Sequence, residues 1–188
     1  KKVCEKHNAK CIITSKKCLT GTDRVAEVSK KIKAKTYINV QGDEPFFNPN
    51  DLKKLIFASL KYPNLIINGY TPIKSKKLFY NTSIPKVVID KKEFLIYMSR
   101  APIPSNKKKK FIYGWRQICA YSFPKKTLKI FSMQKKKSFI ENIEDIEILR
   151  FLELGIKVKM IKMTDKSMSI DNPEDYKNAK KYIGLKIL

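Results

Sequence analysis

The sequence predicts an α/β fold, and three observations carry that prediction. Short runs rich in β-branched and aromatic residues recur along the chain of 188 residues. Most of these runs are followed by segments with apolar residues at helical spacing. Capping and turn residues separate the runs from the helical segments. This alternation is typical of βαβ units with a largely parallel sheet, and the length suits a single domain with a full hydrophobic core.

The first 70 residues follow this alternation most clearly. The expected elements are the end of a helix, a short strand, a capped helix, a buried strand, a second capped helix and a third strand, at 1–7, 11–14, 22–28, 36–41, 52–60 and 65–67. Apolar residues recur at helical spacing in both capped helices. Thr, Asp or Asn side chains that can cap a helix precede each of them.

The strand at 36–41 stops on a polar cluster that runs from Gln41 to Pro45. Gly42 allows a positive φ or a close approach to a ligand, and Pro45 cannot continue a central ladder. In open α/β sheets, ligands bind outside the carboxyl ends of strands, which makes Asp43 a candidate for a metal or phosphate site. A turn in which Asp43 caps the following backbone explains the same residues. Both interpretations stay open at this point.

The segment 75–106 departs from the alternation. Residues 85–89 and 94–98 read as two strands about the polar turn 90–93, which predicts a β-hairpin inserted in the α/β domain. Such a hairpin often serves as a substrate flap or as a dimer surface, and the sequence alone does not choose between them.

The second half returns to alternating elements. A strand, a helix, a second helix and a strand are expected at 111–121, from 124 onward, at 140–150 and at 156–163. Leu128 and Phe131 are predicted to face inward from the first of these helices. Asp171 follows the last strand and precedes a helix that Pro173 can start, much as Asp43 follows its own strand. Two such carboxylates suit a Mg²⁺ ion that carries a polyphosphate, although an N-cap role explains Asp171 equally well.

The predicted helix at 140–150, which ends near Gly155, is amphipathic and unusually acidic for this chain. Glu144 and Glu147 stand three residues apart and would share one face of an unbroken helix. A solvated face with acids in the first turns explains the pattern, and so does a carboxylate presented to a polar ligand. The sequence alone favours the solvated face. The acids are Glu141, Glu144, Asp145 and Glu147.

The formal net charge of +24 invites assignment to nucleic-acid or anionic-membrane binding. Of the 41 basic residues only four are arginine, which leaves 41 − 4 = 37 lysines spread along almost the whole chain. This distribution indicates a general amino-acid bias, because duplex readers usually employ arginine forks. We hypothesise that each arginine marks a place where planar, bidentate geometry is required. The arginines are Arg24, Arg100, Arg116 and Arg150.

The cysteines and the hydropathy further limit the class of protein that this sequence can represent. The four cysteines form no C-x-x-C pair and have a single histidine beside them, which argues against a zinc site. Reduced thiols in a cytosolic protein explain them. No apolar run approaches the roughly 18 residues that span a bilayer, and no charged leader with an apolar core is expected. We therefore expect a soluble, cytoplasmic protein with no membrane span.

Six motifs occur in one order along nearly the whole chain. They are T-G-T-D-R at 20–24, N-V-Q-G-D-E-P at 39–45, K-V-V at 86–88, S-R-A-P-I-P at 99–104, E-N-I-E-D-I-E-I-L-R at 141–150 and I-D-N-P-E-D at 170–175. Together they resemble the motifs of the 3-deoxy-manno-octulosonate (Kdo) cytidylyltransferase family, also called CMP-Kdo synthetases. Each motif alone is a weak signal, but six in the family's order are a strong one.

The resemblance implies a Rossmann-like mixed sheet of the nucleotide-diphospho-sugar transferase type, with the hairpin at 75–106 as an insertion, acting as a homodimer. It also implies a reaction. The anomeric hydroxyl of Kdo attacks the α-phosphorus of CTP in the presence of Mg²⁺, giving CMP-Kdo and pyrophosphate in lipopolysaccharide precursor synthesis. Such a transfer depends mostly on positioning and charge neutralisation.

The resemblance further implies roles for residues at the matching positions. The catalytic group would be Asp43, Asp171 and Arg24, with Mg²⁺ held by Asp43 and Asp171. The sugar acid would be bound by Gln41, Tyr121, Glu144 and Glu147, with help from the fork of Arg24. The nucleotide would be lined by Thr14, Ser15, Thr20 and Gly21. The roles of Lys86 and Arg100 stay open between the dimer surface and a loop.

The chain departs from the family pattern in three places. The family opens with a phosphate-gripping loop resembling P-A-R-x-x-S-x-R-L-P-G-K, which has no counterpart here, so we expect 1–188 to be a single cytidylyltransferase domain without its N-terminal phosphate-loop unit. The family's H-x-G before Tyr121 is replaced by Trp115-Arg116-Gln117. The Gln that usually follows the third acid is Ile148.

The last two departures fall in the expected sugar pocket and leave a related acidic sugar open. The close alternative is therefore another CMP-sugar synthetase, such as an acylneuraminate cytidylyltransferase. A distant alternative, supported by net charge alone, is a basic nucleic-acid-binding module, and a structural protein with an inactive site is a third.

Overall fold

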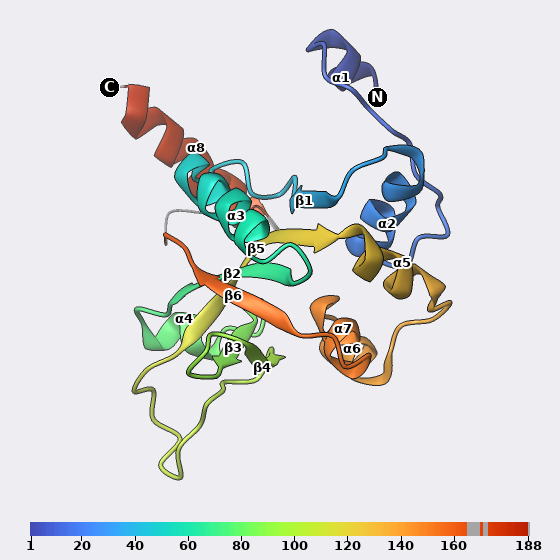
Figure 1. Ribbon diagram of the computed structural model, residues 1–188. Helices are drawn as coiled ribbons and strands as arrows, with labels where there is room; N and C mark the ends of the chain where they lie inside the picture. Colours follow the sequence, from blue (N-terminus) through green and yellow to red (C-terminus); the bar gives the residue numbers. More distant parts are fainter. Residues whose placement is uncertain (165–169, 171–172, 188) are drawn as a thin grey trace.

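The computed structural model describes residues 1–164, 170 and 173–187, which form helices around one mixed sheet (Figure 1). In these residues the sheet has six strands, β1 (Thr36–Val40), β2 (Ile66–Pro72), β3 (Lys86–Ile89), β4 (Leu95–Ser99), β5 (Trp115–Pro124) and β6 (Val158–Lys162). The helices are α1 (Lys2–Lys6), α2 (Gly21–Lys31), α3 (Pro49–Lys61), α4 (Lys76–Tyr80), α5 (Lys125–Met133), α6 (Phe139–Glu144), α7 (Ile148–Glu153) and α8 (Pro173–Ile187). The predicted α/β class is confirmed.

The strand β5 organises the sheet. It pairs antiparallel with β2 along one edge, while its other edge pairs with β3 at its start and with β1 at its end. Among the described residues, only β2 and β6 form a parallel pair. The expectation of a largely parallel sheet is therefore wrong. After the hairpin, a long loop reverses the direction of the chain. β5 then lies between β1 and β2 and runs antiparallel to both.

The predicted hairpin is confirmed as β3 and β4, which pair antiparallel from Lys86 opposite Ser99 to Ile89 opposite Leu95. Its turn is fixed by Asp90, whose Oδ1 accepts hydrogen bonds from the backbone N–H groups of Lys92 at 2.8 Å and Phe94 at 2.7 Å. Aspartate favours such turns because its side chain can bind the backbone that follows it.

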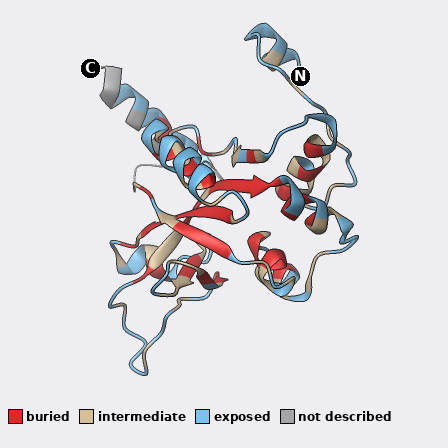
Figure 2. Ribbon diagram, in the orientation of Figure 1, coloured by how far each residue is buried: buried red, intermediate tan, exposed pale blue. Residues whose placement is uncertain are grey.

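Alternate residues of β2 and β5 face two hydrophobic cores, one on each side of the sheet. Both strands are buried along most of their length (Figure 2). Ile66 and Phe123 belong to the core that also takes side chains from α2, α5 and α7. Ile67 and Ile118 belong to the smaller core, which Leu55 of α3 closes. Because side chains alternate along a strand, helices cover both faces of the sheet. The inward positions predicted for α5 are confirmed, since Leu128 and Phe131 are both buried.

The strand expected at 11–14 is absent. Ile12 and Ile13 are 37% and 65% exposed. Within the described part of the chain, β1 pairs with β5 alone and offers no ladder to this segment. A short apolar run becomes a strand only where a neighbouring strand satisfies its backbone groups, and residues 11–14 lack that neighbour.

The single helix expected at 140–150 is two helices. Asp145, between α6 and α7, takes left-handed backbone angles, with φ 50° and ψ 49°. The Arg100 guanidinium stabilises the break, because its Nε donates to the Glu144 carbonyl at 2.6 Å and its Nη2 to the Asp145 carbonyl at 3.0 Å. These are carbonyl groups that a helix end leaves without intrahelical partners. Glu144 and Glu147 therefore do not share a helix face.

None of the helices that the structure describes combines the length and the apolar character that crossing a membrane requires.

Candidate active site

A cavity of about 250 Å³ opens where β5 loses its neighbours on one edge. β3 pairs with β5 as far as Arg116, and β1 pairs with it from Ala120 onward. The two strands leave the middle of β5 uncovered between them. The cavity fills this opening, with walls from the β1–α3 loop, residues 83–85, β5 and the turn 145–147. A crevice of this kind, at the end of a strand where its neighbours diverge, is where open α/β sheets usually bind ligands.

The β1–α3 loop brings two acids to the cavity, Asp43 and Glu44. Asp43 Oδ1 is buried and has no hydrogen-bond partner among the described residues. A buried carboxylate oxygen left without a partner is costly, so Asp43 is a candidate ligand-binding group. Its backbone carbonyl accepts a hydrogen bond from the Ile170 N–H at 2.8 Å. Gly42 does not take the positive φ considered from the sequence.

The strand β5 supplies a polar wall of the cavity, made by Gln117, Cys119 and Tyr121. Burial, together with the charges of Glu44 and Asp43, raises the pKa of the Cys119 thiol to about 12. The thiol is therefore neutral near pH 7 and is not an activated nucleophile. Burial, followed by the charge of neighbouring groups, also raises the pKa of Tyr121 well above its ordinary value. Both groups act at this wall as neutral polar groups.

Two arginines also line the cavity, Arg100 and Arg116. Arg100 is oriented by the α6–α7 break, as described above, and also by Thr82, whose carbonyl accepts from Nη1 at 3.1 Å. Arg116 extends from β5 and its Nη1 donates to the Gln117 carbonyl at 3.4 Å. Guanidinium groups at a cavity wall suit a ligand that carries a carboxylate or a phosphate.

Glu144 does not line this cavity. Its carboxylate accepts hydrogen bonds from Ser99 Oγ at 2.6 Å, the Arg100 N–H at 2.9 Å and the Tyr97 hydroxyl at 3.2 Å. Burial opposes its ionisation, but these hydrogen bonds outweigh burial and lower the pKa of Glu144. Glu144 therefore attaches the end of β4 to α6, and its predicted contact with a sugar stays a prediction.

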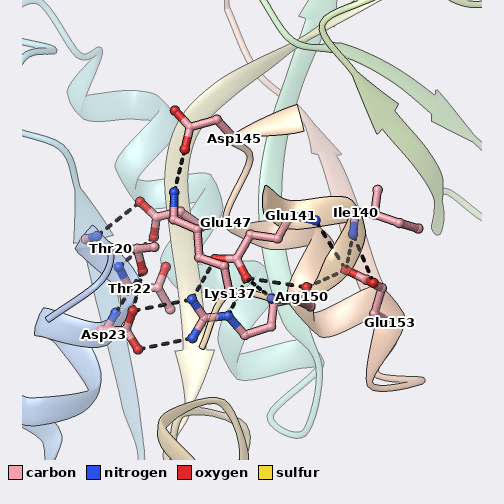
Figure 3. Close-up of polar contacts among 12 residues, drawn as sticks. Thr20, Thr22, Asp23, Lys137, Ile140, Glu141, Asp145, Glu147, Arg150 and Glu153 are labelled. Atoms are coloured by element: carbon pink, nitrogen blue, oxygen red, sulfur yellow. Dashed lines mark hydrogen bonds and ion pairs between the residues drawn. The ribbon is translucent and has the colours of Figure 1, made fainter. Parts of the chain in front are cut away.

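Glu147 reaches from the turn 145–147 to the first residues of α2 (Figure 3). Its carboxylate accepts from the Gly21 N–H at 3.1 Å and from the Thr22 N–H at 2.6 Å. Such N–H groups have no partner within a helix and attract negative charge. A Cβ at position 21 would lie 3.1 Å from Glu147 Oε1, so a larger residue would crowd this contact. Thr20 completes the helix start as its N-cap.

A buried arginine ties α2 to α6 and α7 behind Glu147 (Figure 3). Arg150 is fully buried, and its Nε and Nη2 each donate to one oxygen of Glu141 at 2.6 Å. Its Nη1 also donates to Asp23 Oδ1 at 3.2 Å. The guanidinium carbon lies 3.8 Å from the centroid of the Phe131 ring. This bidentate, stacked geometry requires arginine and cannot be reproduced by lysine.

A second hollow of about 630 Å³ runs beside β1 and α2 and shares Gln41 with the first cavity. Thr14, Gly21 and Arg24 line it. Arg24 Nη1 donates to Thr14 Oγ1 at 2.7 Å and to the Ser15 carbonyl at 3.2 Å. The structure thus has two adjoining hollows that meet at the end of β1.

The predicted site residues divide between these hollows. Those in the first cavity are Gln41, Asp43, Tyr121 and Glu147. Those in the second are Thr14, Gly21, Arg24 and again Gln41. Three predicted residues line neither hollow, namely Ser15, Thr20 and Glu144. Asp171 lies outside the described residues.

Glu44 and Cys119 line the first cavity but had no role assigned from the sequence. Glu44 belongs to a recognised motif and is 7% exposed beside Asp43. Cys119 stands two residues before Tyr121 on β5, and Gln117, which the resemblance had placed in the expected sugar pocket, stands four residues before it. The alternation of side chains along a strand, applied backward from Tyr121, is the signal that would have found Cys119.

Asp43 is the candidate metal ligand that the sequence predicted and that lines the first cavity. Among the residues that the structure describes, no group of three or more His, Cys, Asp or Glu side chains is arranged to hold a metal ion. Asp43 contributes a buried carboxylate oxygen with no partner, which is the type of ligand that Mg²⁺ takes. A Mg²⁺ ion needs only one or two protein carboxylates when phosphate oxygens and water complete its shell, so Asp43 fits such an ion.

Comparison with known proteins identifies relatives along most of the chain. The family model described as "Cytidylyltransferase" matches residues 1–170. A 3-deoxy-manno-octulosonate cytidylyltransferase of Thermodesulfovibrio yellowstonii is 36% identical over 192 residues, which cover 94% of this chain and 74% of the relative. The protein of the same name from Christiangramia forsetii is 35% identical over 167 residues, which cover 87% of this chain and 67% of the relative.

Solved structures lead to the same family. A CMP:2-keto-3-deoxy-manno-octonic acid synthetase, complexed with CTP, superposes with a TM-score of 0.89 at 26% identity, covering 98% of this chain and 76% of that one. An inositol-1-phosphate CTP transferase from T. maritima shares the fold, with a TM-score of 0.62 at 19% identity over 93% of this chain and 65% of its own. These matches confirm the resemblance found in the six motifs. The chain belongs to the cytidylyltransferase family and is a nucleotidyltransferase with a Rossmann-like fold.

Proposed function

We propose that this cytidylyltransferase transfers CMP from CTP to the anomeric hydroxyl of Kdo, releases pyrophosphate, and so makes CMP-Kdo for lipopolysaccharide precursor synthesis. The observation that carries the proposal is the composition of the first cavity, where Asp43, Gln41 and Tyr121 line the same hollow as Arg100 and Arg116. The names of the relatives, given above, support the choice of substrate.

The first cavity suits a polyhydroxylated sugar acid. Arg100 and Arg116 supply positive charge for its carboxylate. Gln41, Gln117 and Tyr121 supply neutral donors and acceptors for its hydroxyl groups. Held in this way, the sugar would present one hydroxyl toward the end of β1, where the two hollows meet.

The second hollow suits the nucleotide. Arg24 contributes positive charge, and Thr14 and Gly21 contribute a hydroxyl and the backbone of a helix start. Because Gln41 lines both hollows, a nucleotide in one and a sugar acid in the other would approach each other beside Asp43. Bringing two reactants together in this way supplies most of what a phosphoryl-type transfer needs from the protein.

We propose Asp43, together with Asp171, as the carboxylates that hold Mg²⁺. The unpartnered Oδ1 of Asp43 supports this assignment, and so does the hydrogen bond from Ile170, the residue just before Asp171, to the Asp43 carbonyl. When bound there, Mg²⁺ would neutralise triphosphate charge and favour deprotonation of the attacking hydroxyl. The protein's own contribution there is to hold the Asp43 carboxylate at the wall of the first cavity.

The test is product analysis with the protein expressed from its complete coding sequence. Incubation with CTP, Mg²⁺ and Kdo is expected to yield pyrophosphate and CMP-Kdo, detected by an enzyme-coupled pyrophosphate assay and by mass spectrometry. Asp43→Asn is expected to lower kcat at least a hundredfold, because an amide binds Mg²⁺ poorly. Asp90→Asn is the matched control, since Asp90 fixes the hairpin turn and does not line the cavity.

The assay should include a panel of acidic sugars, because Gln117 stands at the cavity wall where the family pattern has another residue. Transfer to N-acetylneuraminate in preference to Kdo would replace the proposed substrate by an acylneuraminate. Transfer to neither sugar would contradict the proposed function, and unchanged activity in Asp43→Asn would contradict the assignment of Asp43 to Mg²⁺.

We also propose that the protein works in the cytoplasm as a homodimer. Exposed apolar side chains on and beside the hairpin support an interface there, since Ile96 is 58% and Ile112 is 79% exposed. The four cysteines are free thiols, as expected in a reducing compartment. Sedimentation of the wild type and of Ile96→Lys tests the dimer, because a charge in a homodimer interface should shift the equilibrium toward monomer.

A further inference from the structure

The pairing of β2 with β5 contains an irregularity directly behind the first cavity. Asn68 pairs with Tyr121, but the next residue, Gly69, pairs with Ile118. Cys119 and Ala120 therefore have no partners on β2. A Cβ at position 69 would lie 2.4 Å from Met163 Sδ, so a larger residue would force the Met163 side chain to move. Bulges of this kind redirect side chains and occur often beside active sites.

The Asn68 side chain fills the irregularity. Asn68 is fully buried, and its Nδ2 donates to the carbonyls of Ile118 at 3.0 Å and Ala120 at 2.9 Å. Backbone carbonyls only accept hydrogen bonds. The two of them therefore fix the orientation of the Asn68 amide, with its nitrogen toward β5 and its Oδ1 available as an acceptor.

The fixed Asn68 amide in turn fixes Gln117. Gln117 Nε2 donates to Asn68 Oδ1 at 3.1 Å and to the Tyr121 hydroxyl at 3.0 Å. A primary amide nitrogen carries two hydrogens, and these two hydrogen bonds use both. A reversed Gln117 amide would set its oxygen against Asn68 Oδ1, where neither atom could donate. The group that Gln117 has left for a ligand is thus its carbonyl oxygen Oε1.

We propose that Asn68 is a positioning residue that holds Gln117 with Oε1 as a hydrogen-bond acceptor for the sugar, so that Gln117 selects a substrate with a hydroxyl donor at this wall. The identity of the sugar rests on the proposed function, whereas the orientation of Gln117 is independent of it. Asn68 itself does not line the cavity and acts only through Gln117. Sites built to pair with a substrate hydroxyl discriminate strongly against analogues that lack it.

Steady-state kinetics of Asn68 variants provide the first test. In Asn68→Ala, the Gln117 amide is free to reverse, so KM for Kdo is expected to rise about tenfold while KM for CTP changes less than twofold. Asn68→Ser, whose hydroxyl can still donate to one carbonyl, is the milder variant if Asn68→Ala does not fold. Asn142→Ala, on the exposed side of α6, is the matched control and should change neither constant.

A double-mutant cycle separates positioning from a general loss of structure. Gln117→Met removes both the donor and the acceptor at similar length. In that background, Asn68→Ala is expected to change KM for Kdo by less than twofold, because the group it orients is gone. A rise of about tenfold in both backgrounds would show that Asn68 does not act through Gln117 and would overturn the proposal.

A measurement that needs no sugar tests the orientation directly. The side-chain amide hydrogens of Gln117, followed by proton–nitrogen NMR, are expected to exchange slowly in the wild type and at least tenfold faster in Asn68→Ala. Gln134, which is exposed, supplies the reference for fast exchange. If the protein fails to use Kdo but this protection is seen, the proposed substrate is wrong and the orientation of Gln117 stands. If Gln117 exchanges as fast as Gln134 in the wild type, the orientation is wrong whatever the substrate.

Discussion

At the scale of single residues, the scarce arginines serve mainly to join segments of this protein. Arg150 donates from Nε and from Nη2 to the two carboxylate oxygens of Glu141, which is the bidentate geometry that the hypothesis about arginine requires. Arg100 donates to three backbone carbonyls around the α6–α7 break. Arg24 departs from the hypothesis, because both of its hydrogen bonds leave from Nη1 alone. The scarcity of arginine in a lysine-rich chain was therefore a useful but incomplete guide to geometry.

Lys86 is the buried lysine beside these arginines, and its role was left open by the sequence. Its Nζ donates to the carbonyls of Asn81 at 2.9 Å and Ile84 at 2.7 Å, and also to the carbonyl of Arg100. Lys86 thus holds together two segments that line the first cavity. Burial, together with the charge of Arg100, lowers the pKa of Lys86 from 10.5 to about 8.

The lowered pKa of Lys86 predicts a specific dependence of stability on pH. Between pH 8 and 10.5, the unfolded chain keeps a proton that the folded protein has released. The free energy of unfolding therefore rises with pH over this interval, by at most about 1.4 kcal/mol per pH unit from this group. Urea denaturation of the wild type and of Lys86→Met, from pH 7.5 to 10, is expected to show this rise in the wild type relative to the variant.

The difference between the two curves isolates Lys86, because all other groups titrate in both proteins. Lys91→Met, in the exposed hairpin turn, should run parallel to the wild type. Parallel curves for Lys86→Met as well would mean that Lys86 keeps an ordinary pKa in the folded protein.

At the scale of elements, the break between α6 and α7 decides which carboxylate reaches which partner. Because Asp145 interrupts the helix, Glu144 turns to the end of β4 and Glu147 turns to the start of α2. An unbroken helix would set both on one face and could serve only one of these neighbours.

The left-handed conformation of Asp145 predicts an unusual order of stability. We expect Asp145→Gly to be more stable than Asp145→Ala by about 1 kcal/mol, since glycine takes positive φ without steric cost. Both variants lose the ion pair with Lys137, so this loss cancels in the comparison. Urea denaturation measures the difference. The same pair of substitutions at Lys129, exposed in the regular helix α5, should give the opposite sign.

Local sequence patterns correctly predicted those helices and strands whose structure depends on the residues of one segment. The hairpin, the helix opened by Pro124 and the strand that leads to Asp43 all appear as expected. The absent strand at 11–14, the broken helix at 140–150 and the direction of β5 were missed for a common reason. Each depends on a partner distant in the sequence, namely a missing ladder, the Arg100 side chain and the return of the chain through the hairpin.

The residues of the site likewise divide into those that the sequence predicted and those that depend on distant partners. Asp43 and Gln41 were found from a motif at a strand end and Tyr121 from the family resemblance, and the fold brings all three into one cavity. The contribution of Asn68 had no sequence signal, because it depends on a two-residue irregularity in the pairing of β2 with β5. Pairing register is a property of the whole sheet and is not written in either strand alone.

At the scale of the whole molecule, the net charge of +24 remains to be reconciled with a nucleotidyltransferase. Lysines spread along the chain carry nearly all of this charge. Arg150, which would be a natural fork for phosphate or base edges, is fully buried and committed to Glu141, and Arg100 lines the first cavity. The charge should therefore attract polyanions without recognising their sequence.

The dispersed lysine charge predicts the affinity of the protein for duplex DNA and the salt dependence of that affinity. Affinity for a duplex of about 20 base pairs should be no tighter than about 1 µM at 0.15 M salt, should fall steeply and linearly on a log–log plot against salt, and should not depend on sequence. Fluorescence anisotropy with two unrelated duplexes at 0.05 and 0.2 M salt tests all three points. Sequence-dependent binding that survives 0.2 M salt would revive the nucleic-acid-binding alternative, because counterion release alone cannot produce it. If both complexes dissociate at 0.2 M salt while the protein still transfers CMP to Kdo, the net charge reflects amino-acid bias and the function belongs to the first cavity.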